Sequence, residues 1–148
     1  IDGSVLIDDG VLYAISYQGS AVAIDSASGQ ILWKKEASSI NSPASNFENI
    51  FFINNDGILV SLDKYTGRVK WKQSKFFKRL VGSPIIFNDF IIVGDIENYL
   101  HIINTDTGSI SGRIKTTDKI QSFYNELDSL YILDKNFSLK KINISKTD

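Results

Sequence analysis

The 148-residue sequence has no cysteine, no methionine, a single histidine and no long apolar run. Without cysteine there can be no disulfide framework, thiolate metal site or cysteine nucleophile. One histidine cannot supply the converging side chains of a zinc site or a nucleophilic constellation. No apolar run approaches membrane-spanning length, and no signal peptide opens the chain. Because methionine is missing even at position 1, we expect the chain to be a piece of a longer protein.

The charges nearly cancel, since 16 basic residues stand against 17 acidic ones. This balance gives no reason to expect a nucleic-acid or membrane-surface partner. Apolar residues make up 43% of the chain, which is enough for a core. Most acidic residues fall in predicted turns, where turn geometry already explains them.

Residues 64–79 are a local exception, because they hold seven basic residues and no acid. Aromatic residues lie between these cations, a pattern that can bind single-stranded nucleic acid. Arg68, Lys70 and Lys72, however, alternate with apolar residues, as on an edge strand with one solvated face. We therefore predict a solvated edge strand. The loop at residues 75–78 that follows it is the exposed apolar candidate for protein contact.

A repeated turn motif organises the chain. Each copy has an Asp or Asn, then a glycine four residues later, and the first two copies add a tryptophan four residues after the glycine. The members are Asp25, Gly29 and Trp33, then Asp63, Gly67 and Trp71, then Asn104, Gly108 and Gly112. The Asp or Asn can accept backbone N–H bonds across a corner, and the glycine supplies the positive φ that the corner needs. Glycine spacings of 38 (29 to 67) and 41 (67 to 108) indicate a period near 40.

Aligned on this motif, the chain divides into four repeats at about residues 5–40, 41–80, 81–120 and 121–148. The first three contain four short runs of β-branched and aromatic residues bounded by Gly, Asn and Asp turns. No window shows convincing helical periodicity. Four antiparallel strands per repeat predict an all-β chain, a partial β-propeller over residues 1–148 with about four blades. A β-sandwich and an irregular β-solenoid are the competing interpretations.

The number of predicted strands indicates that the partial propeller does not close into a ring. The fourth repeat has room for only three strands, and the chain begins at the first strand of a repeat, so neither end has a spare strand to close a ring. We therefore expect the C-terminal part of a longer propeller, with an unpaired strand edge at each end. Such edges can pair with another chain, and two copies would together supply eight repeats.

The motif resembles the tryptophan-docking motif of the pyrroloquinoline-quinone (PQQ) dehydrogenase-like propellers. Residues 17–36 and a second block, which comprises residues 78–80, 83–84 and 94–104, are similar to the BamB family of outer-membrane assembly lipoproteins. The most specific part is the run at 94–104, whose matching positions are Gly94, Asp95, Glu97, Tyr99, Leu100, His101 and Asn104. The resemblance implies an eight-bladed propeller of which half is present. It also implies a non-catalytic scaffold at the periplasmic face of the outer membrane, anchored by a lipidated N-terminal cysteine that this chain lacks.

The same resemblance implies a partner, the POTRA domains of BamA. Asp2 matches one position of an acidic loop that contributes to BamA binding in this family. A PQQ dehydrogenase would be expected to show a calcium site and often an adjacent cysteine pair, and neither is recognisable. We therefore expect no enzyme activity, cofactor or metal, and we interpret the motif residues as fasteners between blades. A fragment of a PQQ-dependent periplasmic dehydrogenase is the alternative.

The single histidine, His101, lies on a predicted strand whose alternation places it on the same face as Tyr99 and Ile103. We predict a packed, hydrogen-bonded strand residue rather than a base or a metal ligand.

Overall fold

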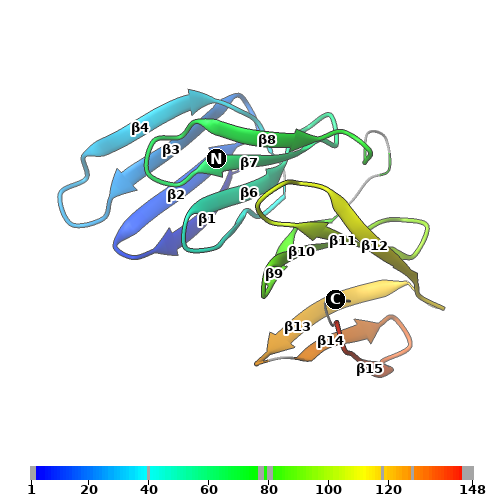
Figure 1. Cartoon of the computed structure of the whole chain (residues 1–148). Coiled ribbons are helices and arrows are strands. Elements are labelled where there is room, and N and C mark those ends of the chain that lie inside the picture. The colour runs from blue at the N-terminus through cyan, green and yellow to red at the C-terminus, as the bar shows by residue number, and fades with distance from the viewer. Residues whose placement is uncertain are drawn as a thin grey trace.

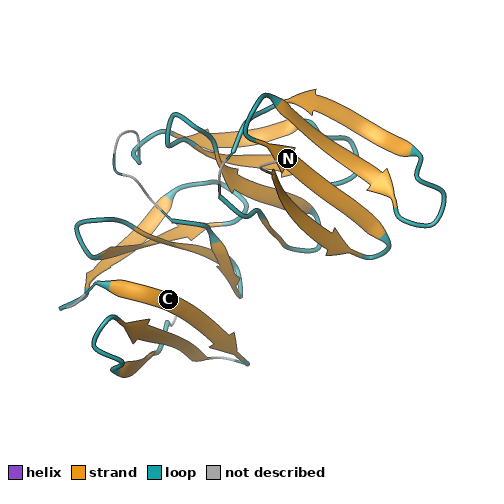
Figure 2. Ribbon diagram, turned by 180° about the vertical axis from the view of Figure 1, so that it is seen from behind, coloured by secondary structure: helices purple, strands orange, loops and turns teal. Residues whose placement is uncertain are grey.

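The computed structural model describes residues 3–39, 41–76, 79, 82–117, 119–127 and 129–144. These residues form strands β1 to β15 in four antiparallel sheets that follow one another along the chain (Figure 1). Strands joined by loops are the only regular elements that Figure 2 shows in the described residues. In this part of the chain no helix is long and apolar enough to cross a membrane. The all-β prediction is confirmed.

Each sheet is built from strands that are consecutive in sequence. The first contains β1 (Gly3–Asp8), β2 (Val11–Ser16), β3 (Ser20–Asp25) and β4 (Ile31–Glu36). The second contains β5 (Ala44–Ser45), β6 (Asn49–Ile53), β7 (Leu59–Asp63) and β8 (Val69–Gln73). The third contains β9 (Ile85–Phe87), β10 (Phe90–Gly94), β11 (Tyr99–Asn104) and β12 (Ile110–Lys115). The fourth contains β13 (Ile120–Glu126), β14 (Ser129–Asp134) and β15 (Leu139–Ile142).

Every strand pairs with its neighbour in sequence, so the first and last strands of each sheet are its edges. The pairing of the last two strands shifts register at the same place in the first three sheets, between Ala23 and Ile24, Ser61 and Leu62, and Ile102 and Ile103. Each shift lies next to the turn motif, and a bulge at such a place changes the direction in which the neighbouring side chains point. The edge position of β8 agrees with the strand predicted from its alternating lysines.

The core is divided among the interfaces between successive sheets. Side chains of β2 and β3 meet Phe52, Val60 and Leu62 of the second sheet. Phe51, Ile53 and Leu59 on the opposite face of the second sheet meet the third. A further cluster joins the third sheet to Leu130 and Ile132 of the fourth. Because the second sheet is covered on both faces, all five residues of β6 are buried.

The outer face of the first sheet is open in this structure. Val5 and Ile7 on β1 are 57% and 68% exposed, and Ile31 on β4 is exposed as well. Val5 pairs with Ala14 and Ile7 with Leu12, so these apolar side chains share one face of the sheet.

The sequence prediction for the loop at residues 75–78 is wrong for Phe76. Its ring is 1% exposed and packs between the second and third sheets with Phe51, Ile91 and Val93. An aromatic ring buries a large apolar area, and this interface has room for it. Residues 77 and 78 lie outside the described residues.

Candidate functional site

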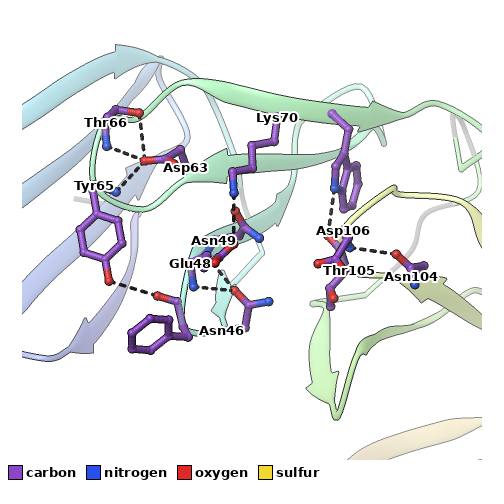
Figure 3. A network of polar contacts seen from close by, with 12 residues as sticks. Asn46, Glu48, Asn49, Asp63, Tyr65, Thr66, Lys70, Asn104, Thr105 and Asp106 are labelled. Atoms are coloured by element: carbon purple, nitrogen blue, oxygen red, sulfur yellow. Dashed lines mark hydrogen bonds and ion pairs between the residues drawn. The ribbon is translucent and has the colours of Figure 1, made fainter.

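The three turn motifs share one pattern of hydrogen bonds. Oδ1 of the first residue accepts two backbone N–H groups, and the glycine N–H donates to that residue's carbonyl. The side-chain bonds run to Asp25 from Ala27 and Ser28 (3.1 and 2.7 Å), to Asp63 from Tyr65 and Thr66 (3.0 and 2.8 Å), and to Asn104 from Asp106 and Thr107 (2.9 and 3.0 Å). Figure 3 shows the second and third of these turns. The pattern closes each corner with local groups alone.

The motif glycines and carboxylates suit this geometry. Gly29, Gly67 and Gly108 have φ of 73°, 70° and 71°, a region that favours glycine. The hydroxyl and backbone N–H of Ser28 hold the pKa of Asp25 below its ordinary value, because both donate to the ionised carboxylate.

Each motif tryptophan contacts the turn of the following sheet. The indole Nε1 of Trp33 donates to the Lys64 carbonyl at 2.9 Å. Its ring lies on Gly67, where an added Cβ would sit 2.8 Å from Cδ2. Trp71 repeats both contacts one sheet further on, with Nε1 3.0 Å from the Thr105 carbonyl. A Cβ on Gly108 would lie 2.6 Å from Cδ2 of Trp71.

The pattern stops at both ends of the array. No described residue lies within 4 Å of a Cβ built on Gly29, although its turn matches the other two. At the other end, Gly112 takes the place of a tryptophan on β12. There the third and fourth sheets meet through their apolar cluster and the bond from Asn125 Nδ2 to the Ile86 carbonyl at 3.1 Å.

An ion pair between a buried lysine and a half-buried aspartate joins the first two sheets. Lys64 is 5% exposed, and its Nζ lies 2.5 Å from Oδ2 of Asp8. The hydrogen bond from Lys64 lowers the pKa of Asp8, and Ser45 adds a second bond at 2.9 Å. Sequence reasoning missed this pair, because the two residues stand 56 positions apart and no local pattern links them.

A second polar cluster surrounds Asp95 at the start of the β10–β11 turn. Oδ1 accepts the N–H groups of Glu97 and Tyr99, at 2.9 and 3.0 Å. Oδ2 lies 2.7 Å from Nε2 of His101 and 3.3 Å from Nη1 of Arg79. Burial alone would raise the pKa of Asp95, but these hydrogen bonds, with His101 first among them, outweigh burial and lower it.

His101 is thus a packed strand residue, as predicted. It is 5% exposed, and the edge of its ring meets Phe76 with centroids 4.9 Å apart. Within the described residues, no three His, Cys, Asp or Glu side chains gather as metal ligands would. Asp2 lies outside the described part of the chain.

The chain is similar to proteins of one family. A family model described as outer membrane protein assembly factor BamB matches residues 1–73. BamB of Yersinia pestis is 38% identical over 108 residues, which is 73% of this chain and 28% of that protein. BamB of Legionella pneumophila (strain Paris) is 32% identical over 146 residues, or 98% of this chain and 38% of that protein. The crystal structure of BamB from Moraxella catarrhalis superposes on the whole chain with a TM-score of 0.87 at 24% identity.

The chain is BamB-like and has the fold of part of a PQQ β-propeller. Its four sheets correspond to 46% of the Moraxella chain, so the predicted propeller is confirmed over the sandwich and the solenoid. This BamB-like chain spans between 28% and 38% of the length of the two curated relatives above. A quinohemoprotein alcohol dehydrogenase from Comamonas testosteroni shares the fold of 78% of the chain, with a TM-score of 0.62 at 20% identity.

Proposed function

We propose that this chain is part of a non-catalytic scaffold that assists assembly of β-barrel proteins into the outer membrane. The similarity to proteins named outer membrane protein assembly factor BamB, at 32–38% identity over 73–98% of the chain, carries the proposal. In this function the chain positions partner proteins and performs no chemistry. A ring of packed sheets suits that task, because it holds many loops rigidly on two faces.

We further propose that each repeat is one blade and that the motif residues fasten blades together. These residues are Asp25, Gly29, Trp33, Asp63, Gly67, Trp71, Asn104 and Gly108. The bonds from Trp33 and Trp71 to the next turn support this role, since they cross from one sheet to the following one. The side chain of Gln73 adds a third such link, from its Nε2 to the Gly108 carbonyl at 2.8 Å.

The proposed partner of the full-length protein is the POTRA region of BamA, at the periplasmic face of the outer membrane. Asp2 is the proposed contact in this chain, through its acidic side chain. The proposed anchor of the full-length protein is a lipid on an N-terminal cysteine.

The test is binding of the full-length protein to the isolated POTRA region, measured by isothermal titration calorimetry. We expect binding, and we expect Asp2→Arg to weaken it. Asp106→Arg is the matched control, because it makes the same charge change on an exposed turn at another site. Failure of the full-length wild-type protein to bind would contradict the BamA proposal. Equal effects of the two variants would contradict only the role of Asp2.

A fragment of a PQQ-dependent dehydrogenase is the second candidate, favoured by the fold shared with the Comamonas enzyme. Titration of the full-length protein with PQQ and calcium separates the two candidates. We expect no change in the PQQ absorption spectrum, whereas saturable binding of PQQ would support the dehydrogenase.

A further inference from the structure

A small pocket lies beside the Asp95 cluster. It has a volume of about 150 Å³. Its lining residues are Lys75, Phe76, Arg79, His101, Ile110 and Arg113. Cationic side chains thus share the wall with two apolar side chains and a buried imidazole. None of these residues belongs to the turn motif.

The pocket has more cationic side chains than it has carboxylates paired with them. Arg79 pairs with Asp95 at 3.3 Å and with Glu97 at 3.5 Å. Lys75 and Arg113, by contrast, form no ion pair with any residue that the structure describes. Both are exposed, so their charges face the solvent at the pocket. Two positive charges are therefore available to a ligand there.

Internal contacts hold two of the lining groups in place. The Arg113 guanidinium stacks over the Tyr99 ring, 4.8 Å from its centroid, which leaves its N–H edge able to donate. The His101 ring is held on its other side by Asp95. The Asp95 carboxylate is ionised at neutral pH and can only accept, so Nε2 of His101 donates to it.

We propose that this pocket binds the side-chain carboxylate of an acidic residue in a partner polypeptide. Arg113 presents a planar guanidinium group, which binds a planar carboxylate through paired hydrogen bonds, and Lys75 adds the second available cation. Phe76 and Ile110 provide apolar wall for the methylene groups that accompany a carboxylate in a peptide, and a free phosphate has no such part. The proposal does not depend on the partner proposed above.

Edge strand β12 extends the positive charge beside the pocket. Lys115 on this strand is exposed, and its Nζ lies 4.2 Å from the centroid of the Tyr99 ring that Arg113 also contacts. Lys70 and Lys72 on β8 do not add to this charge, because Lys72 pairs with Val60 on the face turned to the first sheet and Lys70 pairs with Glu48 at 3.5 Å (Figure 3). A further cation beside a positive pocket favours a segment with several carboxylates over an isolated one. The partner segment therefore carries further acidic residues next to the anchoring one.

The test is an NMR titration of the 148-residue chain, in roughly physiological salt so that diffuse attraction is screened. Three probes are compared: an acetylated Gly-Glu-Glu-Glu-Gly amide, its all-glutamine analogue and inorganic phosphate. We expect saturable shifts of the His101 ring and of the Lys75 and Arg113 amides with the glutamate peptide. Much weaker effects are expected with the other two probes.

Variants locate the site. Arg113→Gln should weaken binding of the glutamate peptide by about tenfold, as expected for loss of a charged hydrogen-bond donor. Lys34→Gln removes one exposed charge from β4, outside the pocket, and should change affinity by less than about twofold. Arg113 is exposed, so the fold is expected to survive its replacement. Equal loss in both variants would overturn the pocket in favour of a diffuse field. Equal binding of the glutamine peptide, or tighter binding of phosphate, would overturn the carboxylate assignment.

Discussion

Replacing Gly67 by alanine tests the contact between Trp33 and the turn of the second sheet. Gly29→Ala is its matched control, because the two glycines occupy the same turn position with φ of 70° and 73°. They differ in one respect. The ring of Trp33 lies on Gly67, whereas in the part of the chain that the structure describes no atom comes within 4 Å of a Cβ on Gly29.

The expected magnitudes follow from two separate costs. Left-handed backbone costs an L-residue about 1–2 kcal/mol, and both variants bear this cost. In Gly67→Ala the new Cβ would also stand 2.8 Å from Cδ2 and Cε3 of Trp33, so the ring must retreat. Overpacking of this kind costs about 1–3 kcal/mol, and the retreat weakens the indole bond to Lys64. We therefore expect Gly67→Ala to lose about 1–3 kcal/mol more unfolding free energy than Gly29→Ala.

The assay is urea unfolding followed by far-UV circular dichroism. The same substitution is also made in a Trp33→Ala background. Without the indole ring, the cost of Gly67→Ala should fall to that of Gly29→Ala, because only the backbone cost remains. Equal costs for the two glycine variants in the wild-type background would refute the proposed docking contact, and so would an unchanged cost in the Trp33→Ala background.

Three further predictions concern other contacts. Trp71→Ala should lower the free energy of unfolding by about 2–4 kcal/mol in the same assay, which is less than the loss for a fully buried tryptophan because this ring is half-buried. A near-neutral result would contradict its fastening role. The lowered pKa of Asp95 means that its stabilisation is present above its ordinary value of 3.8 and is lost as the pH falls through the lower folded value. Asp95→Asn should therefore flatten the acid side of the stability–pH curve, and a curve parallel to wild type would count against this. Light scattering over a concentration series should show dimers formed through the open edges, and a monomer throughout would contradict self-association.

The turn motif could be predicted from sequence because its contacts are local. The carboxylate or amide of each first residue reaches N–H groups two and three positions ahead, and the glycine φ depends on its own corner. His101 could be predicted as a packed residue for a related reason. Strand alternation places it on the same face as Ile103, and that face is buried.

Phe76 shows where local reasoning fails. Lys75 and Lys78 flank the Phe76–Phe77 pair in sequence, and a run with charges on both sides is typical of exposed chain. Its burial depends on space between the second and third sheets, which arises only when both sheets are in place. The same holds for Arg79, which reaches Asp95 16 positions away.

The sequence by itself determined the strands, the corners and the repeat, since each depends on residues within a few positions of one another. The tertiary structure alone decided which surfaces meet. Trp33 finds the Lys64 carbonyl 31 positions away, and Lys64 finds Asp8 56 positions back. The alternation of apolar and polar residues predicts which side of a strand is apolar. Which residues cover that side depends on how the sheets stack. The pocket at Arg113 likewise exists only because separate sheets bring its walls together.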